Sequence, residues 1–391
     1  MLVKGGARNA RSTADGACSD VGPITLLQQL HQGLLQCGSR AHGARIIGHI
    51  GPYLSVMITA HLVLVLKFVT SLPNLSDTCL KTQGGPNMAI ENKIRRVIRW
   101  GLYPVSWIWV VCALNRFLAM GVDERPAWIL ITLPLLLTYL VIELTLPMQK
   151  RWSMTWRTLL PDLAYIVSSG ATVALVSAGL AMLTITISSK TGGPARDWPI
   201  WIQLPVLFLV FEFMNYHIHR GMHELRGPLG RLLWRIHAAH HLPERLYLLM
   251  HAVSHPFNAV LVQAFAIILP IWLMGYSPDT VLIFLVINAF HGIISHFNVD
   301  LRLGWANYIF VGPEVHRYHH SADVNEAKNY GATLTLWDQI FGTFVFHPGL
   351  APQELGVSPD ANLPPYQQIP SVLALPFRRS GQESLEQADH V

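Results

Sequence analysis

The sequence predicts an all-α protein, a polytopic bundle of transmembrane helices with a histidine-rich helical cap. Hydrophobic residues make up 51% of the 391 residues and charged residues only 13%, about half the ~25% of a soluble globular protein. Long apolar runs recur along the chain, and 13 of the 19 histidines lie between His217 and His320. The low charge and high apolar content exclude intrinsic disorder. They also exclude most soluble folds, because much of the apolar surface is expected to face lipid.

Seven apolar runs are candidates for membrane-spanning helices, because most reach or approach the ~20 residues that cross the hydrocarbon. They lie at about 51–70, 101–121, 127–147, 160–187, 199–218, 257–275 and 280–297. Residues 1–50 contain no apolar stretch that ends in a small-residue cleavage site, so we expect an N-terminal arm or surface helix rather than a signal peptide. The expected organisation is this arm, N-terminal membrane helices at 51–198, a histidine-rich domain at 199–346 and a polar C-terminal tail at 347–391.

Positive charge indicates which connections face the cytoplasm. Basic residues gather in three connections, at 93–99, 150–157 and 220–245. An even number of expected membrane crossings separates each of these connections from the next, so all three can lie on the cytoplasmic side. The arginines of residues 1–50 break this pattern if the first run spans the bilayer, so a full crossing by that run stays open. Because the basic residues lie between apolar runs rather than in one patch, they do not indicate a nucleic-acid partner.

The linker at 275–279 is rich in turn residues, so the sixth and seventh runs are expected to form a helical hairpin. A hairpin returns the chain to the side from which it started. The segments that follow Arg220, surround His255 and follow His296 are therefore expected on one face of the membrane.

Eight histidines form three clusters with helical spacing: His219 and His223, then His237, His240 and His241, then His316, His319 and His320. Positions three and four apart on a helix lie on one face. A single pair four apart is common by chance, but His-x-x-His-His occurs twice. Adjacent imidazoles are costly to bury unless a cation holds them neutral. Eight are too many for one ion, so the pattern predicts a dinuclear metal site in the cytoplasmic cap.

Other histidines are assigned by their position relative to the runs. His296 directly follows the seventh run, so the hairpin delivers it to the same interface and it is expected to be a ninth ligand. His291 and His255 are further candidates, for which helix-end or loop roles are the alternative. His217 points to a different helix face from His219, and His251 is interpreted as background.

The ligand type narrows the metal only in part, because imidazole suits iron, zinc, copper and nickel. A site at the membrane surface, beneath lipid-facing helices, favours an oxidant for aliphatic C–H bonds. Two irons can deliver the electrons that dioxygen activation requires, whereas zinc has no redox chemistry. The four cysteines lack the spacing of a ferredoxin cluster or a thiolate site, so electrons are expected from a separate protein.

The histidine clusters and their flanks resemble the fatty acid hydroxylase / sterol desaturase superfamily of integral membrane, histidine-rich di-iron oxygenases. The matching runs are HRGMH at 219–223, HAAHH at 237–241, HFNV at 296–299, HRYHH at 316–320, KNYG at 328–331 and WDQIFGT at 337–343. The resemblance covers about residues 199–346. It implies two non-haem iron ions held by the nine histidines His219, His223, His237, His240, His241, His296, His316, His319 and His320.

The resemblance also implies hydroxylation or desaturation of a lipid C–H position with O2 as co-substrate. The electrons would come from a cytochrome b5-like carrier, or from a ferredoxin with its reductase. The membrane would be a bacterial inner membrane, or the endoplasmic reticulum in a eukaryote. An Asp is common in the family where this chain has Glu212, and Glu212, Asn298 and Asp300 are expected to orient imidazoles. The lipid stays open among sterols, fatty acyl chains, sphingoids, ether lipids and carotenoids.

Two other classes of protein are weighed against the oxygenase. A metal transporter would place its ligands at the bilayer midplane, often with carboxylates, whereas the histidine triplets fall outside the apolar runs. A bis-histidine haem protein needs two ligands rather than nine. A zinc-loaded relative with a structural role would keep the same histidines, and metal analysis distinguishes it.

Overall fold

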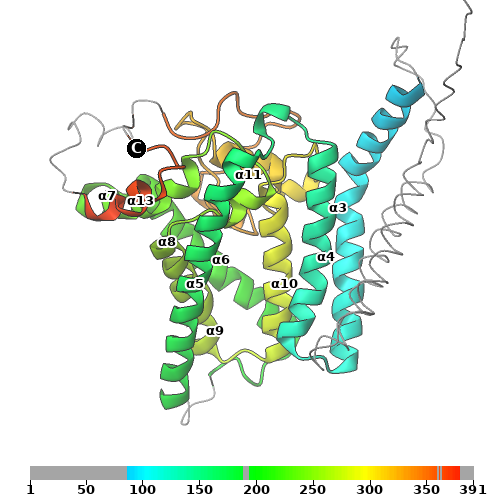
Figure 1. Cartoon of the computed structure of the whole chain (residues 1–391). Helices are drawn as coiled ribbons and strands as arrows, with labels where there is room; N and C mark the ends of the chain where they lie inside the picture. Colours follow the sequence, from blue (N-terminus) through cyan, green and yellow to red (C-terminus); the bar gives the residue numbers. More distant parts are fainter. Residues whose placement is uncertain (1–85, 188–192, 359–360, 362, 379–391) are drawn as a thin grey trace, which may run out of the picture. The chain divides into compact units, whose positions relative to one another are not determined.

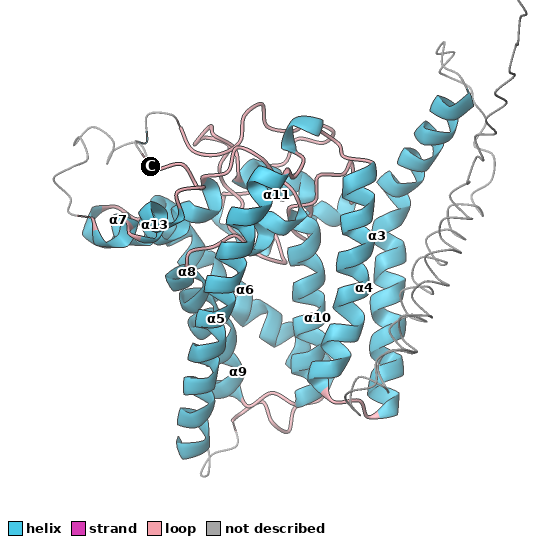
Figure 2. Ribbon diagram, viewed as in Figure 1, coloured by secondary structure: helices cyan, strands magenta, loops and turns pink. Residues whose placement is uncertain are grey.

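The computed structural model describes residues 86–187, 193–358, 361 and 363–378. The chain divides into two compact units, residues 1–59 and 60–391, and every described residue belongs to the second. In these described ranges the regular structure is helical, with two isolated β-bridges and no strands (Figure 2). The all-α fold is thus confirmed, while the arm at 1–50 and the apolar run at 51–70 lie outside the described residues.

Within the described ranges, six helical segments are long and apolar enough to cross a membrane. They belong to α3 (Pro86–Met120), α4 (Glu124–Thr145), α5 (Trp156–Ile187), α6 (Ile200–Glu224), the continuous α8–η3–α9 (Pro256–Leu261, Val262–Ile268, Leu269–Met274) and α10 (Pro278–Ser295). These segments correspond to the second through seventh expected runs. The chain is a multi-pass membrane protein.

Helix α10 is the central member of this bundle, and it packs against α3, α4 and α6, while α5 packs along α8 (Figure 1). Its start has two helix-favouring features, because Ser277 caps the N–H of Thr280 and Pro278 occupies the first turn. Gly275 ends α9 in the left-handed conformation, and its Cα side lies so close to the Gly193 backbone that a Cβ would clash. The expected α9–α10 hairpin therefore forms.

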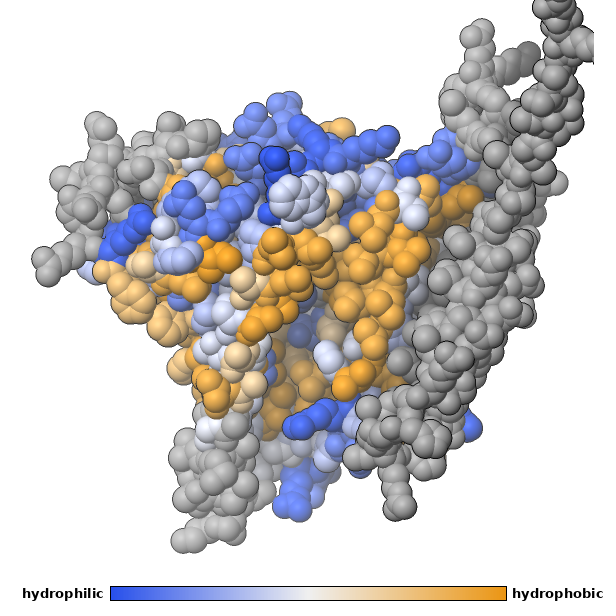
Figure 3. Space-filling model, viewed as in Figure 1, coloured by the Kyte–Doolittle hydropathy of each residue, from blue (hydrophilic) through white to orange (hydrophobic). Residues whose placement is uncertain are grey.

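Apolar side chains cover the outer surface of the bundle. Large exposed examples are Val141, Leu144, Leu160, Val167 and Leu175. Figure 3 shows apolar residues over the middle of the visible face and hydrophilic residues towards its two ends. Only 17% of the most apolar stretch of α5 is buried inside the protein, and only 11% of the most apolar stretch of α8–η3–α9. These two helices therefore offer the most surface to lipid.

The cap consists of short helices at one end of the bundle (Figure 1). They are η1 (Lys150–Trp152), α7 (Gly227–His241), η2 (Leu248–Ala252), η4 (Gly304–Tyr308), α11 (Pro313–His319), α12 (Leu336–Phe341), α13 (Ile369–Leu373) and η6 (Leu375–Phe377). The cap is joined to the bundle through α6, which packs on α7, and through α10, which packs on α11.

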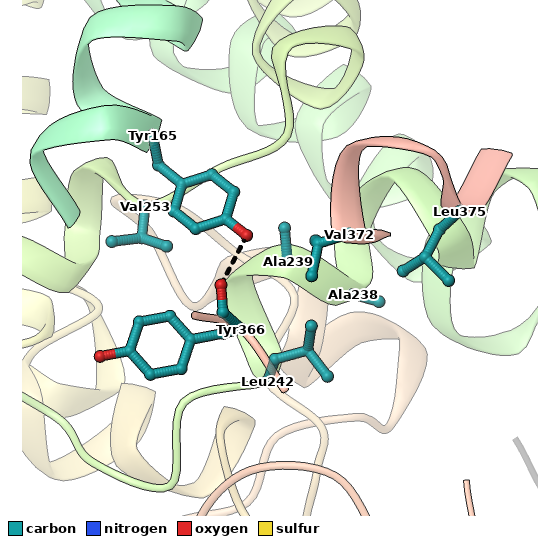
Figure 4. Close-up of a cluster of buried hydrophobic side chains, with 8 residues drawn as sticks. All are labelled: Tyr165, Ala238, Ala239, Leu242, Val253, Tyr366, Val372 and Leu375. Carbon is teal, nitrogen blue, oxygen red and sulfur yellow. Dashed lines mark hydrogen bonds between the residues drawn. The ribbon is translucent and has the colours of Figure 1, made fainter. Parts of the chain in front are cut away.

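The described part of the expected polar C-terminal tail folds onto the cap rather than extending from it. Val372 and Leu375 are fully buried against Ala238, Ala239 and Leu242 of the α7 segment (Figure 4). The Tyr165 hydroxyl of α5 donates a 2.9 Å hydrogen bond to the carbonyl of Tyr366. Apolar residues scattered among polar ones hid this contact in the sequence. The contact covers the back of α7 and leaves its histidine face inward.

Leu375→Ala is expected to lower the free energy of unfolding by about 2–5 kcal/mol, because Leu375 is fully buried and its loss leaves a cavity. Phe377→Ala in the same helix is the matched control, since Phe377 is 71% exposed and such changes usually stay within about 0.5 kcal/mol. Thermal unfolding of both purified variants in detergent measures the difference. Equal stability of the two variants would contradict the packing role of this segment.

Candidate metal centre

Four segments carry the nine predicted ligands to one place in the cap. Helix α6 ends with His219 and His223, and α7 ends with its histidine triplet. His296 is the C-cap residue of α10, and α11 carries the second triplet at its own end. Because each segment ends at the cap, the histidines converge where the membrane bundle stops.

The nine rings form two groups, within each of which the potential ligand atoms all lie within 4.8 Å of one another. The first group is His219, His223, His237, His241 and His319, and the second group is His240, His296, His316 and His320. Each His-x-x-His-His triplet is therefore divided between the groups. The i and i+4 rings join one group and the i+3 ring joins the other, because i+3 and i+4 differ by ~100° around a helix. The spacing alone did not reveal this division.

The nitrogen atoms of the second group converge in a way that hydrogen bonds cannot satisfy. The Nε2 atom of His296 lies 3.1 Å from the Nε2 atoms of His240, His316 and His320. A neutral imidazole has only one N–H, so four such atoms cannot pair with one another. In the first group, the Nε2 of His237 lies 3.1 Å from that of His219 and 3.0 Å from that of His241.

A metal ion fits this convergence of nitrogen atoms. Two imidazole nitrogens bound at ~2.0–2.1 Å to one ion stand roughly 3 Å apart, which is the spacing observed in both groups. A cation at each centre would also satisfy the converging lone pairs. The donor set therefore suits one metal ion in each group.

Hydrogen bonds on the far side of the rings orient several of these nitrogens. Nδ1 of His219 lies 2.9 Å from the carbonyl of Tyr330, Nδ1 of His240 lies 2.8 Å from that of Val253, and Nδ1 of His319 lies 2.9 Å from that of Lys328. A carbonyl only accepts, so Nδ1 carries the proton and Nε2 presents a lone pair to the group centre. Backbone carbonyls leave no signal in a sequence, and the sequence analysis missed them.

Two side chains that the sequence analysis also missed contact the ligands. The amide oxygen of Asn258, in α8, lies 3.2 Å from Nδ1 of His237. The Ser295 hydroxyl lies 2.8 Å from Nδ1 of its neighbour His296. A polar residue beside an expected ligand is a weak signal, and Asn258 is separated from its ring by 21 residues.

Glu212, Asn298 and Asp300 support loops and make no hydrogen bond to an imidazole in the described part of the chain. The fully buried Glu212 carboxylate accepts from the backbone N–H groups of residues 332–334, at 2.6–3.1 Å. Asn298 is bonded to Gln149, and Asp300 pairs with Arg99 and Arg302. Nearness in sequence to the ligands does not identify the partners of these side chains, which are backbone groups, Gln149 and two arginines.

His255 and His291 belong to neither group. Nδ1 of His255 accepts from the N–H of Phe257 at 3.1 Å and caps α8, while Nε2 lies 3.2 Å from the Leu373 carbonyl. The His291 ring stacks on Phe310, with centroids 4.7 Å apart. His255 therefore has the helix-end role that was its alternative. His217 packs on Phe213 and away from both groups, as expected.

Burial keeps the cap histidines neutral. It lowers the pKa of His240 to about 4. Burial, reinforced by neighbouring imidazoles, holds the pKa values of six others well below the ordinary range: His237, His241, His296, His316, His319 and His320. Neutral imidazole is the form that binds a metal ion.

The metal-free protein is expected to lose stability as the pH falls from about 6.5 towards 4. Unfolded histidines take up protons near pH ~6.5, whereas the buried rings resist protonation until lower pH, so protons favour the unfolded chain. The contribution of neutral rings is fully present above pH ~6.5. Thermal unfolding of the metal-free protein between pH 7.5 and 4.5 tests this, and an unfolding temperature that does not change would contradict it.

Comparison of the sequence with known proteins identifies a family domain that contains the histidine groups. Residues 204–343 match the family model described as fatty acid hydroxylase. Residues 204–343 belong to the fatty acid hydroxylase family. This fatty acid hydroxylase domain contains all nine histidines of the two groups. No solved structure matches the chain.

Relatives of the fatty acid hydroxylase domain act on lipids, as their names state. The chain is 28% identical over 295 residues to ornithine lipid hydroxylase OlsE of Rhizobium tropici, covering 71% of this chain and 85% of that protein. It is 30% identical over 145 residues to human alkylglycerol monooxygenase (35% and 29%), and 24% identical over 166 residues to C-4 methylsterol oxidase erg25 of Schizosaccharomyces pombe (41% and 52%). It thus spans about a third of the monooxygenase and half of the sterol oxidase.

These relatives all belong to the fatty acid hydroxylase / sterol desaturase superfamily, and the predicted resemblance is confirmed. The protein is an oxidoreductase that contains a fatty acid hydroxylase domain. Its relatives and its apolar helices support the coarser description of a lipid oxygenase in a membrane.

Proposed function

We propose that the protein is a non-haem di-iron oxygenase that hydroxylates a membrane lipid with O2 and externally supplied electrons. The convergence of nine imidazoles into two groups carries the proposal. Hydroxylation is favoured over desaturation because the relatives are named hydroxylase, monooxygenase and oxidase.

One iron ion would be held by each group, and the pair would supply the redox chemistry that activates O2 for attack on a C–H bond. The chain's own residues prepare the site for these ions. The carbonyls of Tyr330, Val253 and Lys328 keep the proton on Nδ1, so Nε2 can bind metal. Burial keeps the rings unprotonated and limits the entry of water.

The lipid substrate would reach the centre from the hydrocarbon. The two helices with the most exposed apolar surface are α5 and α8–η3–α9, and α8 also provides Asn258, which contacts His237. A substrate with a polar head group would place that group at the cap and its chains among the helices, as expected for relatives of an ornithine lipid hydroxylase.

Electrons would come from a separate carrier, cytochrome b5-like or a ferredoxin with its reductase. The positive-inside pattern of the connections supports a cytoplasmic cap, where such a carrier is available. The corresponding membrane would be a bacterial inner membrane or the endoplasmic reticulum.

Lipid analysis of cells with and without the gene tests the activity. We expect one oxygenated lipid to disappear when the gene is deleted and to return with the wild-type gene, with 18O from labelled O2 in the new hydroxyl. The purified protein should contain two irons per chain and show no Soret band. A Soret band, or a lipid profile unchanged by deletion, would overturn the proposal in favour of a haem protein or a metal transporter.

A further inference from the structure

His251 lies beside the second group, although it is not among the nine predicted ligands. Its ring centroid is 5.4 Å from that of His296. The rings of His240 and His320, which do belong to the second group, are each 5.0 Å from His296. The second group has four imidazoles and the first has five. His251 lies where one more imidazole would give both groups five.

The segment that carries His251 is anchored at both ends, at one end to a membrane helix and at the other to the metal centre. At its start, the N–H of Leu248 donates to both oxygens of the Glu143 carboxylate, at 3.1 and 3.0 Å. At its end, the carbonyl of Val253 binds Nδ1 of His240 at 2.8 Å. The backbone of η2 is therefore anchored to membrane helix α4 on one side and to a second-group histidine on the other.

Gly292 of α10 leaves the space that the His251 ring occupies. A Cβ at Gly292 would lie 2.6 Å from Cε1 and 2.7 Å from Nε2 of that ring. Glycine within a helix costs about 1 kcal/mol relative to alanine, and this close approach gives it a physical reason. The ring is thus wedged between α10 and His296.

No group in the described ranges hydrogen-bonds to either ring nitrogen of His251, although the ring lies against Gly292 and the buried His296. Nothing therefore commits those nitrogens to another role. The ring is held against a member of the second group, so its nitrogens lie close to the place where that group would hold an ion.

From this geometry we infer that His251 is a fifth imidazole ligand of the metal ion held by the second group. The inference rests on the proposed function, in which each group binds one ion. It makes the two ions equivalent in ligand number. It also assigns Gly292 as the positioning residue that keeps the His251 ring against His296.

Release of cobalt(II) from the full-length protein in detergent tests this assignment. The protein is loaded with two equivalents of cobalt(II), and loss of its visible absorption is followed after EDTA is added. His251→Ala is expected to speed release of one ion at least tenfold and to leave the other within about twofold, since even indirect partners of a ligand change affinity 10–100-fold. The absorption of that ion should also strengthen as it falls from five ligands to four.

Two further variants complete the experiment. Gly292→Ala keeps the imidazole and pushes the ring from its seat, so it should also speed release of one ion, and it decides the question if His251→Ala does not fold. His217→Ala removes an exposed histidine that lies in neither group, and should release both ions at the wild-type rates. Wild-type rates and absorption in the folded His251 and Gly292 variants would overturn the assignment. A wild-type protein that binds fewer than two cobalt ions would instead defeat the proposed function.

Discussion

Replacement of His296 by alanine is expected to remove one of the two proposed metal ions and to abolish lipid oxygenation. Nε2 of His296 approaches three other nitrogens of the second group, so its loss leaves a site without its central donor. His319→Ala should act in the same way on the first group. In the proposed di-iron mechanism both ions are needed, so each variant should be inactive while it retains about one iron per chain.

Metal content by mass spectrometry and turnover of the lipid substrate measure this result. His217→Ala is the matched control, because that ring packs on Phe213 and Phe341 and belongs to neither group. It should retain two irons and normal turnover. A His296→Ala protein with two irons and full activity would falsify the proposed ligand set.

Glu212→Ala is expected to lower the free energy of unfolding by about 3–5 kcal/mol, the second large effect. The Glu212 carboxylate is fully buried and accepts hydrogen bonds from three consecutive backbone N–H groups, those of Ala332, Thr333 and Leu334. Each buried donor left without a partner costs about 1–3 kcal/mol. The loop also carries the Tyr330 carbonyl that orients His219, so iron should dissociate faster as well.

Two substitutions distinguish the effect of the charge of Glu212 from the effect of its side-chain length. Glu212→Gln keeps the length but only one accepting oxygen, and Glu212→Asp keeps both oxygens on a shorter chain, so both should be intermediate in thermal stability. Glu124→Ala, an exposed position at the start of α4, should stay within about 0.5 kcal/mol of the wild type. The role of Glu212 would be wrong if Glu212→Ala were as stable as this control.

Several structural features could be predicted from residues alone. The apolar runs from 101 onwards became helices that can span a membrane, because an unbroken apolar stretch of that length has few alternatives. The repeated His-x-x-His-His pattern singled out the rings that converge, since helical spacing fixes which side chains share a face. The hairpin at 275–279 brought His296 to the same place.

Other features depend on contacts between distant segments, which a sequence does not display. The carboxylate of Glu212 was expected to face an imidazole, yet it binds a loop 120 residues later. The buried positions of Val372 and Leu375 arise only when the C-terminal segment meets the back of α7. His251 looked like background until α10 placed Gly292 against its ring.

The sequence by itself determined a helical membrane protein and most of its candidate ligands, because hydrophobic length and helical period act within one segment. Only the tertiary structure decided how the nine histidines divide into two groups, which carbonyls orient them and which further ring lies beside them. Those outcomes depend on how helices cross and on which backbone groups face each other, and both are settled by packing of the whole bundle.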